Sequence, residues 1–193
     1  MAGLGKQAKT LTRAQIEMVA SYLRSKRNGL RNQTIFLLSA RAGLRAKEIS
    51  GLTWDMVITQ TGEIDDSIYL TNKASKGNSG RIIPIHPSIK SNLNQLIRYK
   101  TNSPFIITTE RAEKANAQTI VNMFRDWYQK TGLIGCSSHS GRRTFITKAA
   151  QKISLVGGSL RDVQLLAGHS NLQTTQRYIE CNNEAQRSVI KLL

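Results

Sequence analysis

Five short patterns in the sequence carry side chains that bind anions, move protons or act as nucleophiles. A guanidinium presents a fixed fork of N–H donors, an imidazole transfers protons near neutral pH, and a phenol becomes a nucleophile when it loses its proton. In chain order the patterns are Gly43-Leu44-Arg45-Ala46-Lys47-Glu48-Ile49, Lys76-Gly77-Asn78, His139-Ser140-Gly141-Arg142, Leu166-Ala167-Gly168-His169-Ser170 and Thr174-Thr175-Gln176-Arg177-Tyr178. Taken together and in this order, they indicate one site.

Each pattern on its own also has an ordinary structural explanation. Arg45 and Glu48 fit a local ion pair at a helix junction, and Lys76 fits a solvated lysine in a turn. His139 fits a structural histidine beside a surface arginine, the glycine-histidine turn fits a helix cap, and the ring of Tyr178 fits simple packing. The occurrence of all five patterns together, in this order, is therefore what favours a catalytic site.

The order and spacing of the five patterns resemble the catalytic domain of the tyrosine recombinases, the phage integrase family. That domain has a glycine-leucine-arginine helix junction, a lysine in a sheet turn, a His-x-x-Arg helix, a Leu-(Gly/Ala)-Gly-His turn, and a tyrosine nine residues later. The resemblance extends from about Thr12 to Glu180. It implies six catalytic residues, which are Arg45, Lys76, His139, Arg142, His169 and Tyr178.

The resemblance implies that Tyr178 attacks a DNA phosphodiester. Because a phenol has a pKa of ~10, it needs a base, and His139 is the candidate. The two arginines would neutralise the non-bridging oxygens of the phosphate. Lys76 would protonate the departing 5′ oxygen, and His169 would donate to a phosphate oxygen. The product is a 3′-phosphotyrosyl enzyme with a free 5′ hydroxyl, and neither ATP nor magnesium is implied as a cofactor.

The implied partner is double-stranded DNA, bound by a tetramer of the chain, with accessory DNA-bending proteins as a further possibility. Three basic residues beside the catalytic positions are candidate phosphate contacts: Arg143, Lys148 and Arg177. A solvated surface is the alternative for each of them. The resulting function is site-specific integration, excision or inversion of DNA, by a protein encoded by a bacterium or a phage, with a mobile element as its setting.

Two other functions compete with this one. A type IB topoisomerase shares the arginine, lysine and tyrosine chemistry but relaxes supercoils without pairing two sites. A non-cleaving DNA-binding regulator or accessory factor would keep the fold and the positive charge. The Ala167-Gly168-His169 turn favours a recombinase over the topoisomerase, and a regulator would have no need of Tyr178 or Lys76.

The composition agrees with an anionic partner. The 193 residues include 28 Lys or Arg and 12 Asp or Glu, which gives a net charge of +16. The charge is spread along the chain, which favours nucleic acid over a membrane surface. The two cysteines cannot form a disulfide framework and lack the paired spacing of a zinc site. No apolar run suits a signal peptide or a membrane span. These features predict a cytoplasmic, nucleoid-associated protein with no membrane partner.

Helical periodicity, caps and turn residues predict the elements that must position the site. Helices are expected over about residues 12–28, 32–43, 44–52, 87–97, 120–132, 139–151 and 159–167, with another starting at 171. Strands are expected at 68–70 and 81–85, in a β-hairpin or a three-stranded sheet. The predicted fold is mainly α with a small antiparallel β-sheet (α+β), the tyrosine recombinase catalytic-domain fold.

The predicted organisation is a short N-terminal arm (1–11), one catalytic domain (12–180) and a C-terminal tail (181–193). The tail is apolar near its end, which fits exchange between protomers or packing within its own protomer. Family members usually carry a further helical domain before the catalytic one. With about 11 residues before the first expected helix, this chain fits either a compact natural member or an excised catalytic domain.

Overall fold

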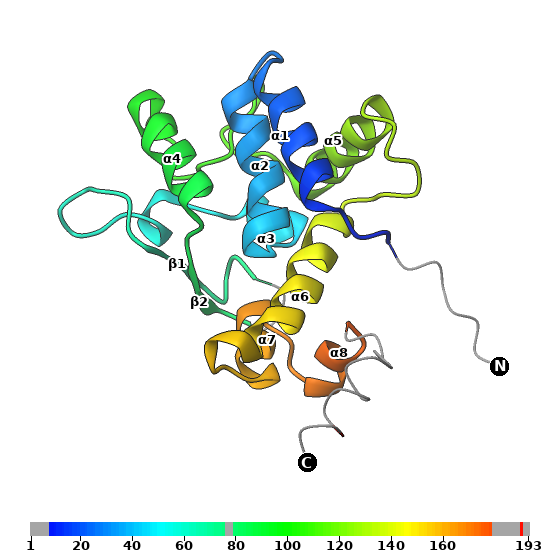
Figure 1. The fold of residues 1–193 in the computed structure, drawn as a ribbon. Coiled ribbons are helices and arrows are strands. Elements are labelled where there is room, and N and C mark those ends of the chain that lie inside the picture. The colour runs from blue at the N-terminus through cyan, green and yellow to red at the C-terminus, as the bar shows by residue number, and fades with distance from the viewer. Residues whose placement is uncertain (1–7, 76–78, 179–189, 191–193) are drawn as a thin grey trace.

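Helix α2 (Gly29–Ala42) runs through the middle of the molecule (Figure 1). The structure, a computed structural model, describes residues 8–75, 79–178 and 190. Every residue of α2 from 34 to 40 is buried, so the helix must be covered on all sides. Its neighbours are α1 (Arg13–Arg24), α4 (Pro87–Leu96) and α6 (Ser140–Lys152).

Local sequence signals set the ends of these helices. The Thr12 side chain accepts a hydrogen bond from the backbone of Gln15, and the Gln15 side chain accepts one from Thr12 N–H, which completes a capping box at the start of α1. Pro87 occupies the first turn of α4, where its missing N–H costs nothing. Helix α2 starts at Gly29, three residues earlier than predicted, because Asn28 turns the chain in a left-handed conformation there.

The sheet has two antiparallel strands in the described part of the chain, β1 (Ser67–Leu70) and β2 (Arg81–Pro84). Ile68 pairs with Ile83 on the face turned to the core, and Tyr69 pairs with Ile82 on the exposed face. This alternation is typical of a half-buried hairpin. The hairpin alternative is therefore the one observed.

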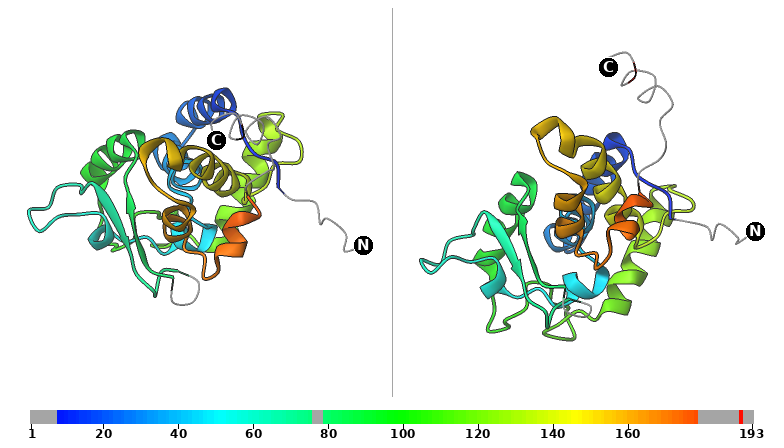
Figure 2. Two further views of the ribbon diagram at one scale, coloured as in Figure 1. Left: turned by 60° about the horizontal axis from the view of Figure 1, so that its bottom comes forward. Right: turned by 90° about the horizontal axis from the view of Figure 1, so that it is seen from below.

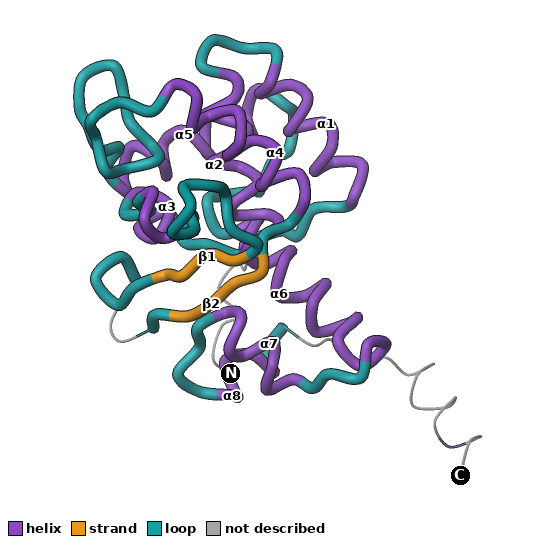
Figure 3. Tube along the Cα trace, turned by 90° about the vertical axis from the view of Figure 1, so that its left-hand side faces the viewer, coloured by secondary structure: helices purple, strands orange, loops and turns teal. Residues whose placement is uncertain are grey.

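The remaining elements are shorter or cover the edges of the core. They are α3 (Ala46–Ser50), η1 (Trp54–Met56), η2 (Ile97–Tyr99), α5 (Ala117–Lys130), η3 (Ile153–Val156), α7 (Leu160–Ala167) and α8 (Leu172–Gln176). Helix α7 lies between β2 and α8 (Figures 2 and 3). The prediction of a mostly helical fold with one small antiparallel sheet is confirmed.

Two apolar clusters hold these elements together. The larger one joins the sheet and the helices from α1 to α5. The smaller one consists of Ile146, Val163 and Ala167, with the partly buried Phe145 and Tyr178 against it. Helix α6 packs on both α2 and α7, and its buried Ile146 belongs to the smaller cluster.

Gly141 allows the close approach of α6 and α2, since a Cβ there would lie 2.6 Å from Ser39 Oγ. The clusters and this contact fix the start of α6 against the end of α2. None of the helices in the described residues combines the length and hydropathy that a membrane crossing requires.

Candidate active site

Five of the six predicted catalytic residues line one pocket of about 580 Å³. They come from four places in the chain: the junction before α3, the start of α6, the turn after α7 and the end of α8. They are Arg45, His139, Arg142, His169 and Tyr178. The sixth, Lys76, lies outside the described residues. The structure thus brings together side chains that are up to 133 residues apart in the sequence, from Arg45 to Tyr178.

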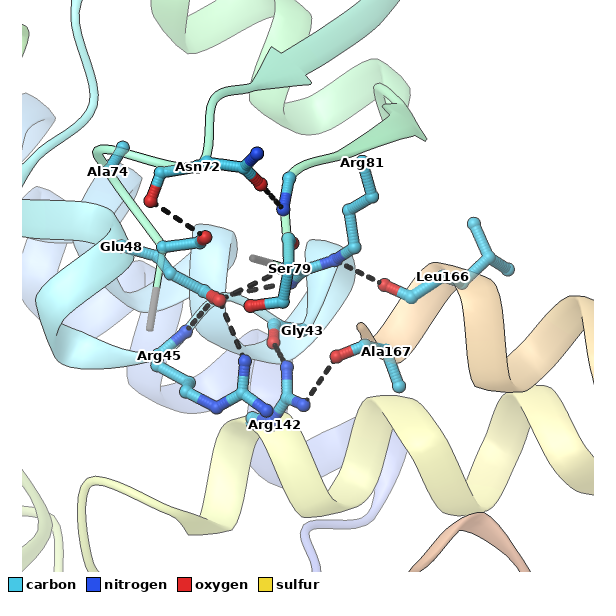
Figure 4. A network of polar contacts seen from close by, with 12 residues as sticks. Gly43, Arg45, Glu48, Asn72, Ala74, Ser79, Arg81, Arg142, Leu166 and Ala167 are labelled. Carbon is cyan, nitrogen blue, oxygen red and sulfur yellow. Dashed lines mark hydrogen bonds and ion pairs between the residues drawn. The ribbon is translucent and has the colours of Figure 1, made fainter. Parts of the chain in front are cut away.

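Arg45 is the N-cap residue of α3 and is held there by Glu48. Its backbone N–H donates to Glu48 Oε2 at 2.8 Å, and its Nη1 donates to Glu48 Oε1 at 2.8 Å. The side chain of Arg45 keeps 29% of its surface exposed, while that of Glu48 has none. The local ion pair that the sequence suggested does form (Figure 4), and Arg45 also lines the pocket.

Glu48 has a second partner in Arg81 of β2. Arg81 Nη1 and Nη2 donate to the two oxygens of Glu48 at 3.0 and 3.2 Å. Burial raises the pKa of the Glu48 carboxyl, but hydrogen bonds and charge from Arg81, and then from Arg45, outweigh it and lower the pKa below its ordinary value. A buried carboxylate with two arginine partners is therefore ionised at neutral pH.

Arg142 is a buried residue of the pocket lining and is held by the main chain. Its Nη2 donates to Ala167 O at 2.6 Å at the end of α7, and its Nη1 donates to Gly43 O at the end of α2 (Figure 4). Burial, followed by the like charge of Arg45, lowers the pKa of this guanidinium to about 9. It remains a cation at neutral pH, and its remaining N–H donors favour an anion as a ligand.

His169 follows the glycine that ends α7, and its ring is half-buried. Its Nδ1 lies 2.9 Å from the hydroxyl of Thr175, a fully buried residue of α8. Burial, followed by the charges of Arg142, Arg45 and Arg81, lowers the pKa of His169 to about 4. The imidazole is therefore neutral at neutral pH, and a hydrogen bond from Thr175 to Nδ1 would place its proton on Nε2.

Tyr178 packs its ring on His169, with the ring centroids 5.6 Å apart and the planes inclined by 23°. The ring is half-buried and rests against the cluster of α6 and α7. Burial and the charges of Arg45 and Arg81 lower the pKa of Arg142, and Tyr178 opposes this lowering, which places its phenol near that guanidinium. Packing therefore holds the ring in place, and Tyr178 lines the pocket.

His139 is the N-cap residue of α6 and is exposed on the pocket wall. Arg143 and Arg177, two of the three predicted phosphate contacts, line the same pocket, and Arg143 also donates to Ala8 O at 2.8 Å. Lys148, the third predicted phosphate contact, lies near Arg13, Arg41 and Lys152. Its burial and, to a smaller extent, these like charges lower its pKa. The pocket lining does not include Lys148.

Two residues that the sequence did not single out take part in this arrangement. Arg81 sits on the same face of β2 as the buried Ile83, and an arginine in that register signals a buried carboxylate partner. Thr175 lies in one of the five patterns, but nothing in the sequence indicates that its hydroxyl contacts the ring of His169.

The pocket combines two fixed guanidiniums, a neutral imidazole and a phenol. Guanidiniums that are already held by protein groups lose little freedom when they bind an oxyanion, and they stabilise charge that develops on it. The phenol lies beside them and can act as a nucleophile when it loses its proton. The arrangement suits transfer of a phosphoryl ester to tyrosine.

Comparison with known proteins identifies a family and relatives of this chain. The profile of the phage integrase family matches residues 9–185. The chain is 27% identical over 187 residues to tyrosine recombinase XerA of Pyrococcus horikoshii, with 95% of this chain and 60% of the relative covered. It is 29% identical to tyrosine recombinase XerC of Chlamydia pneumoniae, with 88% of this chain and 54% of the relative covered. The chain thus spans little more than half the length of these relatives.

Solved structures show the same fold. The Tn1549 transposon integrase in complex with transposon right end DNA superposes with a TM-score of 0.81 at 18% identity, over 99% of this chain and 67% of that one. XerA recombinase superposes with a TM-score of 0.73 at 22% identity, over 98% of this chain and 65% of that one. Because the family profile matches residues 9–185, nearly the whole chain, the chain belongs to the phage integrase family.

Proposed function

We propose that this chain cleaves and rejoins double-stranded DNA at specific sites through Tyr178, as the catalytic part of a tyrosine-type recombinase. The observation that carries the proposal is the convergence of Arg45, Arg142, His169 and Tyr178 on one pocket. The family membership and the relatives named as tyrosine recombinases support it.

In the proposed reaction, Tyr178 Oη forms a bond to the phosphorus of the scissile phosphate and the bond to the 5′ oxygen breaks. The phenol proton passes to His139, and Lys76 supplies a proton to the departing oxygen. Arg45 and Arg142 stabilise the charge on the non-bridging oxygens. The 3′-phosphotyrosyl bond is preserved until a 5′ hydroxyl attacks it, which reverses the step and joins the strands.

His169 has a separate part in this proposal. Because its pKa is lowered to about 4, the ring is a neutral hydrogen-bond donor at neutral pH and does not take up the proton that the phenol loses. With Nδ1 facing the Thr175 hydroxyl, Nε2–H is free to donate to a phosphate oxygen. Removal of that donor should slow cleavage without removing the nucleophile.

The DNA partner and the assembly belong to the proposal as well. Arg143 and Arg177 on the pocket wall are proposed phosphate contacts. A tetramer on DNA and an exchanged tail at 181–193 remain expectations, and nearly all of the tail lies outside the described residues. Sedimentation of the chain with a duplex that carries its site would measure the assembly.

The test uses nicked duplexes, from which the cleaved strand diffuses away and leaves the covalent complex trapped. Wild-type protein should form adducts that survive denaturation, and Tyr178→Phe should form none while its Kd for DNA changes by no more than about twofold. Tyr99→Phe is the matched control, because Tyr99 is 78% exposed and outside the pocket. Binding without adducts in the wild type would favour the non-cleaving regulator, and supercoil relaxation without pairing of two sites would favour the topoisomerase.

A further inference from the structure

The Arg81 side chain makes four hydrogen bonds beside the pocket, and only 6% of it is exposed. Its Nε donates to Leu166 O at 2.8 Å, its Nη1 to Glu48 Oε1 and Ser79 O at 3.0 and 3.2 Å, and its Nη2 to Glu48 Oε2 at 3.2 Å. These bonds occupy most of the five N–H donors of a guanidinium. Arg81 therefore has little capacity left to bind a phosphate itself.

The bonds of Arg81 connect three segments that carry the site (Figure 4). Glu48 belongs to α3 and holds Arg45. Leu166 belongs to the last turn of α7, three residues before His169. Ser79 follows directly on residues 76–78, the segment that contains Lys76.

The pairing of Arg81 with Glu48 decides how much charge Arg45 has available. Glu48 is fully buried and binds both arginines. With Arg81 in place, one guanidinium compensates the carboxylate and the second positive charge, that of Arg45, remains for a ligand. Without Arg81, a buried carboxylate would have Arg45 as its main partner and would draw that guanidinium away from the pocket.

The other end of Arg81 shapes the turn that presents His169. Arg81 and Arg142 bind the adjacent carbonyls of Leu166 and Ala167, where cations also interact favourably with the helix dipole. The next residue, Gly168, has a φ of +60°, and a Cβ there would lie 2.8 Å from Arg81 Nη1. The turn is thus built directly against the Arg81 side chain.

We infer that Arg81 is a positioning residue of the reaction: it compensates Glu48 so that the charge of Arg45 is available to the scissile phosphate, and it fixes the His169 turn through Leu166. The inference rests on the proposed function for its kinetic consequence. Its electrostatic consequence is independent of catalysis, because burial, the charges of Arg142 and Arg45, and then the charge of Arg81 lower the pKa of His169.

The kinetic test compares Arg81→Gln with the double variant Arg81→Gln/Glu48→Gln. Arg81→Gln should slow adduct formation roughly 10- to 100-fold, the range typical of residues that orient other ligands, with little change in Kd. The double variant removes the uncompensated carboxylate and should recover at least a substantial part of the loss. A merely structural role predicts the opposite, since the double variant loses more buried bonds than the single one.

The matched controls are Arg27→Gln and Arg27→Gln/Glu110→Gln, which remove an ion pair of 2.8 Å whose arginine side chain is 83% exposed. Neither should change the rate. If Arg81→Gln does not fold, Arg81→Lys replaces it. That variant keeps the charge beside Glu48, but a single ammonium cannot bind both carboxylate oxygens and Leu166 O together, so a smaller loss of rate is expected.

The second readout is the NMR titration of His169 in the free protein. In Arg81→Gln the pKa of His169 should rise from about 4, while Arg27→Gln should leave it unchanged. An Arg81 variant that is folded but matches the Arg27 controls in both readouts would overturn the inference. If wild-type protein forms no adduct, the proposed function fails, and the titration, together with inorganic phosphate binding followed at His169, still decides whether Arg81 positions the pocket.

Discussion

At the scale of single residues, the proposed site depends on arginines that are held by protein groups and line the pocket. Arg142 is held by carbonyls from α2 and α7, and Arg45 by a buried carboxylate. Such groups need little reorganisation when a charged ligand arrives, which is the physical basis of electrostatic catalysis. The same bonds make each arginine matter for stability.

Arg142→Lys should lower both the rate and the stability. An ammonium cannot reach Gly43 O and Ala167 O together, so at least one buried carbonyl loses its partner, at a cost of about 1–3 kcal/mol in the free energy of unfolding. Loss of the guanidinium fork should slow adduct formation by roughly 100-fold or more. Urea unfolding and single-turnover cleavage measure the two effects. Arg125→Lys on the exposed surface of α5 is the control, and an Arg142→Lys protein equal to it would contradict the assigned role.

His169 should titrate at about pH 4 in the free protein and at a higher pH when phosphate or DNA is bound. Burial and the neighbouring guanidiniums disfavour the imidazolium, and a bound anion offsets the guanidiniums. NMR of the ring nitrogens checks this. A midpoint near the ordinary ~6.5 in the free protein would show that the ring is not held in the described environment.

The same shift has a consequence for stability. Because the folded-state pKa of His169 lies below its ordinary value, the unfolded chain binds the proton more readily. The stabilisation is complete above about pH 6.5 and is lost as the pH falls towards 4. His169→Gln should therefore show a shallower loss of stability across this window in urea unfolding at several pH values.

At the scale of elements, helix ends do most of the positioning. The C-terminal ends of α2 and α7 and the N-terminal ends of α3 and α6 meet at the pocket, and glycines at two of these ends adopt positive φ. A glycine C-cap lets the chain turn sharply after the last carbonyl. Arg45 and His169 each follow such a turn within two residues.

Gly168→Ala should disrupt the site beyond the backbone strain it introduces. Both Gly168 and Gly132 have positive φ, at +60° and +71°, and alanine in either place costs about 1–2 kcal/mol. Only at Gly168 would the new Cβ meet Arg81, whereas nothing lies within 4 Å at Gly132. Gly132→Ala should therefore keep the cleavage rate and Gly168→Ala should lose it. Equal rates in the two variants would show that the Arg81 contact does not matter.

Most of the elements could be predicted from the sequence because their signals are local. The capping boxes of Thr12 with Gln15 and Ser159 with Asp162 lie within single helical turns, as does the glycine end of α2. The early start of α2 was missed because a left-handed Asn28 leaves no clear pattern. The sequence order of the motifs also predicted which side chains meet, through the resemblance to a known family.

The partnerships inside the site could not be predicted. Arg81 bonds to residues 33 and 85 positions away, and no local rule selects such partners. The direction of the His169 pKa shift has the same origin, since it depends on burial of the ring and then on three arginines from distant segments. A strand arginine that shares a face with Ile83 was the one available signal.

At the scale of the whole molecule, the charge of +16 should make DNA affinity strongly dependent on salt. Arg143→Gln and Arg177→Gln should each reduce the slope of log K against log salt by about 0.9, if each contacts one phosphate. Lys148 lies among Arg13, Arg41 and Lys152 and is not part of the pocket lining, so Lys148→Gln should change the slope less. Fluorescence anisotropy over a salt series measures this. A larger change of slope in Lys148→Gln than in the two arginine variants would contradict this and would place the bound DNA nearer the middle of α6.

The most direct measurement is the chemical identity of the trapped adduct. Wild-type protein is allowed to react with nicked duplex DNA and is digested, and the peptide that carries the nucleotide is sequenced by mass spectrometry. We predict a 3′-phosphate ester on Tyr178 and a free 5′ hydroxyl on the released strand. An adduct on any other residue, a 5′-phosphate linkage, or an adduct that persists in Tyr178→Phe would contradict it.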